Sequence, residues 1–291
     1  MKKISFRFLL LFLSVLLILS LTQFDFSRAA EEPLSVNVKR GKDYVRVHED
    51  PETKTGSVDT SIHHFEGADG FSVDLIGAIH IAEKQYYQRL NETFKKYDVV
   101  LYEVVAEEGT RPDKEYKSSL SVIGTVQHQF GNALGLVHQL GSIDYQPQNM
   151  VHADMTPTEF SQAMKDRKDG FFVWYLRSIG YAMGQPSDTM DVKILTALFA
   201  SDRQKALRKA LSKQIGEIGG EIDAMNGSNG SAIVNDRNDK VLAQAQKLRQ
   251  EGKKKIAIFY GAAHLPDMAE KLEKDFQLQP KQLEWIPAWT F

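Results

Sequence analysis

The feature that most constrains the fold is an apolar segment ending in Gly-x-x-His, which occurs twice in the chain. The first copy runs from Asp74 to His80 (Asp-Leu-Ile-Gly-Ala-Ile-His), and the second runs from Ile258 to His264 (Ile-Phe-Tyr-Gly-Ala-Ala-His). A short apolar stretch of this kind is typical of a buried strand, and the residues after each histidine are typical of a helix. The chain therefore has two strand-to-helix junctions of the same design, which favours an α/β fold.

Other segments extend this pattern into one predicted domain, residues 33–291. Residues 34–80 show the alternation of antiparallel strands, and residues 98–105 are apolar and β-branched, which is typical of a buried strand. The middle of the chain, about residues 113–252, is predicted to be a mostly helical insertion. We therefore expect an α/β fold with a mixed, largely parallel central sheet, flanking helices and antiparallel N-terminal strands. The predicted helices lie near 83–97, 118–140, 157–167, 171–183, 191–199, 203–225, 236–250 and 266–276, and a closing strand is expected at 283–286.

Residues 1–29 have the three parts of a secretory signal. Basic residues precede an apolar run at 8–21, and the small residues Ser27 and Ala29 follow it. Cleavage after Ala29 would remove the segment. The alternative is an uncleaved membrane anchor, although the apolar run is shorter than the roughly 20 residues that span a bilayer. Both interpretations predict an exported protein, periplasmic, secreted or anchored, that meets a membrane only through this segment.

The composition excludes several classes of protein and of metal site. The 36 Lys and Arg residues are balanced by 38 Asp and Glu residues, which argues against nucleic acid as a partner. Without cysteine the chain has no disulfide, no thiolate zinc site, no iron–sulfur cluster and no cysteine nucleophile. Any metal ligands must therefore be His, Asp or Glu side chains.

The first candidate site residues are His80 and His264. Each lies just past the carboxyl end of its predicted strand, where open α/β sheets bind ligands, so the two imidazoles can converge on one point. In each motif the glycine, Gly77 or Gly261, is expected to allow a backbone path or close approach that a Cβ would block. The structural alternative for either histidine alone is a helix cap.

Glu103 and Arg237 are the next candidates. Glu103 lies within the apolar strand at 98–105, where a carboxylate is costly unless it is paired or bound to a metal. The structural alternative is an edge-strand Glu that faces water. Arg237 lies in Asn-Asp-Arg-Asn at the predicted start of a helix, where Asn235 or Asp236 would be the N-cap. The structural alternative for the arginine is a solvated charge.

Two secondary candidates, His152 and Asp154, lie in the segment Val-His-Ala-Asp-Met just before the helix predicted at 157–167. The structural interpretation is that Asp154 or Thr156 simply caps that helix.

The order of these motifs resembles the TraB/GumN/TIKI-like family, part of a wider superfamily with erythromycin esterases and ChaN-like haem-binding proteins. The resemblance runs from about residue 75 to 276 and rests on the two Gly-x-x-His motifs, Glu103 in Leu-Tyr-Glu, and Arg237 in Asn-Asp-Arg-Asn. It implies an α/β fold with these residues in one cleft and, for the best-understood members, a divalent-metal-dependent peptidase activity. Family members often carry Glu before the arginine, where this chain has Asp236, so that residue is left out of the site.

The resulting hypothesis is metal-assisted hydrolysis of a peptide or small-molecule substrate. His80 and His264 would be ligands of a divalent metal (Mn, Co or Zn), and Glu103 a third ligand or general base. Arg237 would stabilise the oxyanion or hold a substrate carboxylate. In a metal-free version, His80 is the base and Glu103 orients it. The alternatives from other classes are a non-catalytic haem- or metal-binding envelope protein of ChaN-like type, and a structural or interaction domain.

Overall fold

The computed structural model describes residues 44–113, 133–166, 196–197, 199–218 and 234–291. The predicted signal or anchor at 1–29 and the predicted helix at 171–183 lie outside the described residues, as do most of the predicted helices at 118–140 and 191–199. Within the described ranges, no helix is long and apolar enough to cross a membrane.

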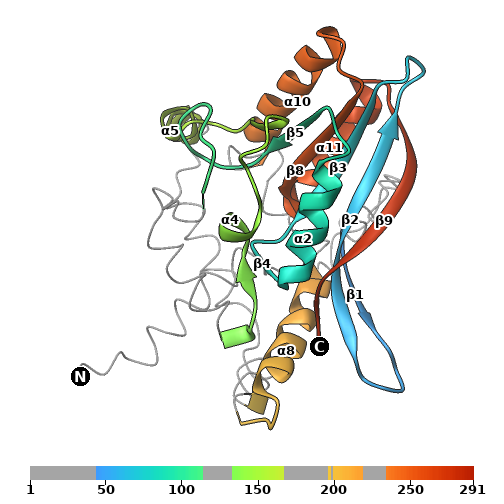
Figure 1. Ribbon diagram of the computed structural model, residues 1–291, viewed down its shortest axis with the longest axis vertical. Helices are drawn as coiled ribbons and strands as arrows, with labels where there is room; N and C mark the ends of the chain where they lie inside the picture. The colour runs from blue at the N-terminus through green and yellow to red at the C-terminus, as the bar shows by residue number, and fades with distance from the viewer. Residues whose placement is uncertain (1–43, 114–132, 167–195, 198, 219–233) are drawn as a thin grey trace, which may run out of the picture.

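The centre of the molecule is a seven-stranded mixed sheet (Figure 1). Strands β3, β8, β5 and β7 are parallel to one another in that order, and β2 continues the sheet antiparallel to β3. The predicted mixed, largely parallel sheet with antiparallel N-terminal strands is therefore confirmed. The strands are β1 (Val45–Glu49), β2 (Gly56–Glu66), β3 (Ser72–Ala78), β5 (Val99–Tyr102), β7 (Met150–His152), β8 (Lys255–Gly261) and β9 (Gln279–Thr290).

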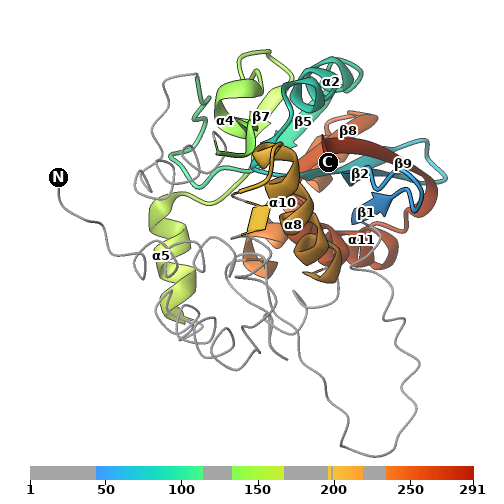
Figure 2. The same cartoon turned by 90° about the horizontal axis from the view of Figure 1, so that it is seen from below.

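The side chains of β8 alternate between two hydrophobic cores, one on each face of the sheet. Ala257 and Phe259 belong to the core beneath α2 (Lys84–Phe94), which buries Tyr86, Tyr87, Leu90 and Phe94 at the predicted helical spacing. Ile256, Ile258 and Tyr260 belong to the opposite core, which α10 (Asn235–Gln250) and α11 (Leu265–Lys274) cover. Figure 2 shows α2 on one side of the strands and α11 on the other. Burial on both faces explains why β3, β5 and β8 are continuous apolar runs.

The antiparallel part of the sheet is built around the long strand β2. β9 pairs with β2 along one edge, over residues 57–66, and is longer than the predicted closing strand. The other edge of β2 pairs with β1 over its first half and with β3 over its second half. Helix α8 (Arg203–Ile218) packs against β1, β2 and β9.

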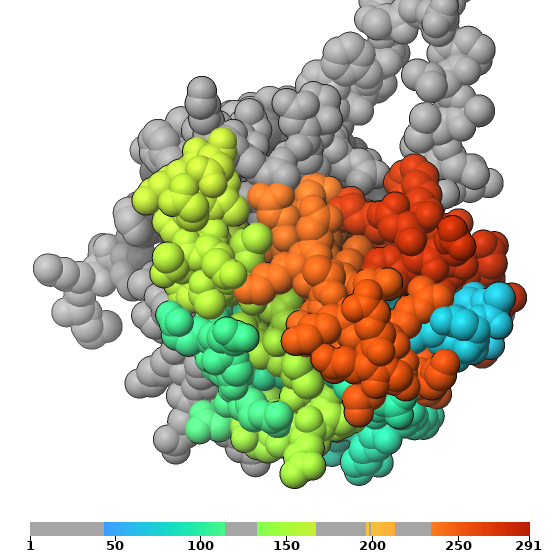
Figure 3. All heavy atoms as spheres, turned by 90° about the horizontal axis from the view of Figure 1, so that it is seen from above, coloured from blue at the N-terminus to red at the C-terminus, as the bar shows by residue number. Residues whose placement is uncertain are grey.

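The described parts of the predicted insertion are not all helical. A short strand, β6 (Val137–His138), pairs with β4 (Ile81–Ala82) just after β3, and leads into α4 (Gln139–Ser142). β7 belongs to the central sheet itself, which the sequence did not predict because the strand has only three residues. Helix α5 (Pro157–Asp166) follows β7 and lies beside α10, where Lys240 Nζ donates to Glu159 Oε2 at 2.6 Å (Figure 3).

Candidate functional site

The candidate residues gather at one edge of the sheet, because four of them follow the carboxyl ends of parallel strands. His80 follows β3, Glu103 follows β5 and Asp154 follows β7. His264 closes a short 3₁₀ turn, η2 (Ala262–His264), directly after β8. Arg237 comes from the first turn of α10. This is the edge at which open α/β sheets bind ligands, as the two Gly-x-x-His motifs predicted.

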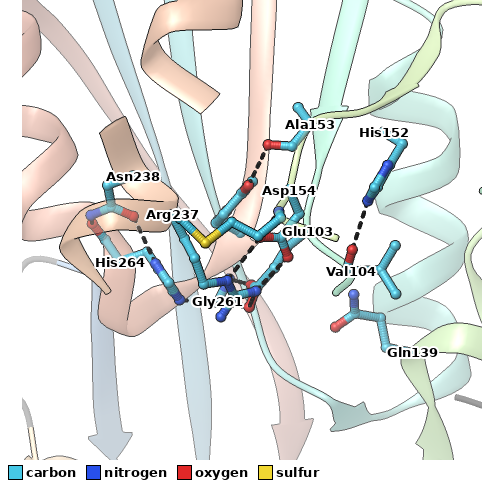
Figure 4. Close-up of polar contacts among 12 residues, drawn as sticks. Glu103, Val104, Gln139, His152, Ala153, Asp154, Arg237, Asn238, Gly261 and His264 are labelled. Atoms are coloured by element: carbon cyan, nitrogen blue, oxygen red, sulfur yellow. Dashed lines mark hydrogen bonds and ion pairs between the residues drawn. The ribbon is translucent and has the colours of Figure 1, made fainter. Parts of the chain in front are cut away.

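Glu103 lies at the centre of this group (Figure 4). Its Oε1 accepts a hydrogen bond from Arg237 Nη2 at 2.7 Å, and its Oε2 accepts one from the backbone N–H of Gly261 at 2.6 Å. His264 Nε2 lies 3.6 Å from Oε1. The Glu103 side chain is 15% exposed, so it is a paired, largely buried carboxylate and not an edge-strand residue facing water.

The surroundings of Glu103 keep its carboxyl group ionised. Burial, the largest single effect, would raise its pKa, but the guanidinium charge of Arg237 and the other neighbours together outweigh it. His264, His80 and the Gly261 amide lower the pKa further, and the result lies well below the usual range of a glutamate. Glu103 is therefore a fixed negative charge at neutral pH.

Asp154 is the second carboxylate on the same guanidinium. Arg237 Nε donates to Asp154 Oδ1 at 2.8 Å and Arg237 Nη2 donates to Oδ2 at 2.5 Å, so the pair is bidentate. The Asp154 side chain is fully buried. Burial would lower the pKa of Arg237, but Glu103 and Asp154 raise it above its ordinary value. Arg237 is thus a buried permanent cation between two carboxylates, and the interpretation of it as a solvated charge is wrong.

Thr156 caps α5, so Asp154 is available for this pairing. The Glu159 N–H donates to Thr156 Oγ1 at 3.2 Å, and the Thr156 N–H donates to Glu159 Oε2 at 2.7 Å, which is a capping box. Of the two caps proposed for this helix, Thr156 is the one the structure supports.

His264 is buried and has a defined tautomer. Asn238 Nδ2 donates to the His264 carbonyl at 3.0 Å and to Asp267 Oδ2 at 2.7 Å, so Asn238 Oδ1 is the acceptor that lies 2.7 Å from His264 Nδ1. The imidazole hydrogen therefore lies on Nδ1, and the Nε2 lone pair is directed towards Glu103. Burial lowers the pKa of His264 to about 4, against an opposing effect of Glu103. The ring is neutral at physiological pH.

Asn238 is a site residue that the sequence analysis missed. It belongs to the Asn-Asp-Arg-Asn segment, whose first residues were expected to cap the helix. The N-cap of α10 is instead Val234, without a side-chain capping bond, and Asn235 Nδ2 donates to Asp267 Oδ1. The prediction that Asn235 or Asp236 is the N-cap is therefore wrong. The signal that could have identified Asn238 is its position beside Arg237 in the same helical turn.

His80 lies at the rim of the group and is exposed. Its carbonyl accepts a hydrogen bond from the Gln139 N–H at 2.9 Å. Its imidazole is close enough to Glu103 to lower the pKa of that carboxyl group. The structure thus brings Glu103, Arg237, Asp154 and His264 into one contact network and places His80 within electrostatic reach of it.

His152 has a different environment. Its Nε2 lies 2.7 Å from the carbonyl oxygen of Val104, and its ring contacts Tyr102 at a centroid distance of 5.9 Å. In Figure 4 the side chain bonds to the Val104 carbonyl, and no contact is drawn between it and Glu103. The structure therefore gives His152 a role in holding the end of β5 and does not bring it into the network.

The two motif glycines are not equivalent. A Cβ on Gly261 would lie 3.3 Å from Glu103 Oε2, which is closer than most such contacts, so the glycine keeps the carboxylate against the backbone N–H. A Cβ on Gly77 would meet its nearest atoms at 3.5 Å, an ordinary van der Waals distance. At Gly261 a Cβ would therefore require Glu103 to move by a few tenths of an ångström, whereas at Gly77 a Cβ would not be blocked, contrary to the expectation for that residue.

The imidazole and carboxylate groups of this site are of the kinds that bind divalent cations. A neutral imidazole held at Nδ1 by a second residue, as in His264, is the usual form of a ligating histidine. The arrangement of these groups does not suit a divalent cation. Within the described ranges, no group of three or more His, Asp or Glu side chains is placed to hold a metal ion. Both oxygens of Glu103 already accept hydrogen bonds, from Arg237 and Gly261. His80, Glu103 and His264 therefore do not form a metal site as they lie here, and metal dependence stays a prediction.

Neither comparison with known proteins adds to this description. No family model matches the chain, and no curated protein matches it. The resemblance to the TraB/GumN/TIKI-like family stays a prediction.

Replacing Asp154 tests the buried ion pair. Asp154→Ala leaves the Arg237 charge buried with one carboxylate partner instead of two, and removing one partner of a buried pair costs about 3–5 kcal/mol. Asp239→Ala is the matched control on α10, because Asp239 is 63% exposed where it pairs with Lys271, and such pairs contribute less than about 1 kcal/mol. Urea unfolding of both variants measures the difference. Equal losses in the two variants would contradict the buried pair.

The lowered pKa of His264 predicts a loss of stability in mild acid. Its pKa is about 4 in the folded protein, and an unfolded histidine has a pKa near ~6.5. Between these values the unfolded chain binds more protons, so the free energy of unfolding falls with decreasing pH, by up to about 1.4 kcal/mol per pH unit. Guanidinium unfolding across this window measures the slope. His264→Gln is expected to reduce it, whereas exposed His48→Gln is expected to leave it unchanged; the same slope in His264→Gln as in the wild type would refute the assignment.

Proposed function

We propose that this protein is an exported hydrolase of peptidase type, which cleaves a peptide or small-molecule substrate with Glu103, Arg237, His80 and His264. The observation that carries the proposal is the ionised Glu103 held between Arg237 and the Gly261 N–H at the carboxyl end of a parallel strand. A largely buried carboxylate with a strongly lowered pKa, beside two imidazoles, is an arrangement typical of catalytic sites.

The charges in the network support a reaction that develops positive charge at His80. The two carboxylates of Glu103 and Asp154 share one guanidinium, that of Arg237, and His264 is neutral. One negative charge is therefore left uncompensated beside an exposed imidazole. Such a charge stabilises the positive charge that develops on a general base as it accepts a proton.

In the proposed reaction, His80 removes a proton from a water molecule while the water oxygen bonds to the carbonyl carbon of the substrate. The tetrahedral intermediate then expels the amine or alcohol, which takes the proton back from His80. Glu103 stabilises His80 while it is protonated. This is the metal-free version of the hypothesis, and no step of it passes through an ion.

We assign Arg237 a different role from oxyanion stabilisation, the one expected from the sequence. Its Nε and Nη2 already donate to Asp154 and Glu103, so we assign it to holding Glu103 ionised and in place, instead of binding the oxyanion. Asn238 holds His264 on its Nδ1–H tautomer, and burial keeps the ring neutral. Export rests on residues 1–29 and enters the proposal on that sequence pattern alone.

The haem- or metal-binding alternative would depend on His80. His264 is 5% exposed and hydrogen-bonded to Asn238, which leaves little room for an iron porphyrin at that ring. Haem binding would give a Soret band on reconstitution that His80→Ala removes.

Removing the charge of Glu103 is expected to abolish turnover. With a panel of fluorogenic peptides and matched esters, Glu103→Gln and His80→Gln should each lower kcat/KM by about 100-fold or more, the usual contribution of acid–base groups. Glu284→Gln and Glu92→Gln are the controls, because both are exposed surface carboxylates. Both controls are expected to keep nearly full activity. If Glu103→Gln and His80→Gln retain wild-type turnover, the proposal is wrong.

The same assay decides the role of a metal. EDTA treatment followed by addition of Mn²⁺, Co²⁺ or Zn²⁺ separates the two versions of the hypothesis. Turnover that survives EDTA supports the metal-free reaction described above. Turnover that EDTA abolishes and an ion restores supports the metal-dependent version.

A further inference from the structure

The loop that carries His80 is held largely by residues distant in sequence. The Gln139 N–H donates to the His80 carbonyl at 2.9 Å, and β4, which follows His80 directly, pairs with β6. Both partners belong to the predicted insertion. On the other side of the loop, Tyr87 Oη donates to the Ile79 carbonyl at 2.7 Å. The backbone on each side of His80 is therefore fixed, although its side chain is exposed.

One arginine of the predicted insertion, Arg208, bonds to several of the segments that support this loop. Arg208 lies on α8, and its side chain is 15% exposed. Its Nε donates to the Leu134 carbonyl at 2.7 Å and its Nη2 donates to the Gly135 carbonyl at 2.9 Å, just before β6. Its Nη1 donates to Glu83 Oε1 at 2.8 Å and to the Thr290 carbonyl at 3.3 Å. A single guanidinium thus bonds to the segment that leads into β6, to the residue after β4 and to the end of β9.

Glu83 is itself fixed to the end of the chain. Its Oε1 also accepts from Thr290 N at 3.2 Å and Thr290 Oγ1 at 2.9 Å, and its backbone N–H donates to the Ala288 carbonyl at 2.8 Å. The β4–β6 ladder has only two residues on each strand and would be weak alone. Because Ala82 lies opposite Val137, Arg208 joins both strands of that ladder, at the end away from His80, to the main sheet.

We propose that Arg208 is a positioning residue of the candidate site, through which the helical insertion sets the distance between His80 and Glu103. The inference rests on the proposed function, because it assumes that His80 acts there. Arg208 is not a catalytic residue, since its contacts are with Glu83 and with backbone carbonyls of the loop supports. The planar guanidinium bonds to four acceptors at once, which the three donors of a lysine ammonium could not match.

The next residue on α8 provides a matched control. Lys209 Nζ donates to Glu49 Oε1 at 2.7 Å and to the Lys54 carbonyl at 2.8 Å, at the end of β1 and in the turn after it. It holds α8 to the antiparallel part of the sheet without touching the His80 loop. Lys209→Met therefore weakens the docking of α8 to a similar extent while leaving the Arg208 contacts in place.

The experiment compares Arg208→Met, Arg208→Lys and Lys209→Met in the full-length protein. Hydrogen exchange of the Gln139 amide reports the bond to His80, and the NMR shift of the His80 Cε1 proton, assigned with His80→Gln, reports the position of the ring. Arg208→Met is expected to accelerate that exchange by about 10-fold or more and to move the His80 shift. It should lower kcat by about 10- to 100-fold with KM nearly unchanged, because the base is misplaced. Arg208→Lys should restore part of each effect, and Lys209→Met should produce none of them.

The outcomes separate this inference from the proposed function. If Arg208→Met matches Lys209→Met in exchange and in the His80 shift, Arg208 does not position His80 and the inference is overturned. If the wild-type protein hydrolyses none of the probes, the proposed function fails, and the exchange and shift measurements alone decide whether Arg208 holds the loop.

Discussion

The rest of the candidate site depends on the buried guanidinium of Arg237. A charge taken out of water is stable only where other charges and hydrogen bonds compensate it, and Arg237 finds this compensation in Asp154 and Glu103. These carboxylates follow β7 and β5, whereas Arg237 begins α10, so one ion-pair network ties two neighbouring strands to the helix that covers them. The helix starts beside the carboxylates, where its positive end also favours negative charge. The network therefore supports both the packing of α10 and the ionised state of Glu103.

The first turn of α10 also carries a second site residue, which contacts the residues after β8. Asn238, next to Arg237, fixes the His264 ring through Nδ1, while Gly261 brings its backbone N–H to the other oxygen of Glu103. The neutral imidazole of His264 and the ionised carboxylate of Glu103 thus lie side by side in the protein interior, and the imidazole adds no buried charge. His80 differs from them in being exposed, so its position depends on the loop around it more than on core packing. This difference explains why distant contacts, those of Gln139 and Arg208, matter for His80 and not for His264.

The sequence predicted the parts of this arrangement that follow from strand patterns. Continuous apolar runs indicate strands buried on both faces, and the carboxyl ends of parallel strands lie at one edge, so the convergence of His80, Glu103 and His264 could be expected. The pairing of Arg237 with Asp154 could not, because the two residues lie 83 positions apart and only tertiary packing joins them. The three-residue strand β7 was too short to show a pattern, and the polar start of α10 favoured a capping role for Asn235, which binds Asp267 instead.

The ionisation of Glu103 is the central claim, and its titration tests that claim most directly. In protein labelled with ¹³C at the glutamate side chains, the Glu103 Cδ resonance can be assigned with Glu103→Gln and followed as the pH is lowered. We predict that it keeps the carboxylate shift through the range near ~4.3 in which ordinary glutamates titrate, for as long as the protein stays folded. A midpoint at or above that ordinary value would contradict the account, because Arg237 and the other neighbours of Glu103 would then not outweigh the burial of the carboxyl group.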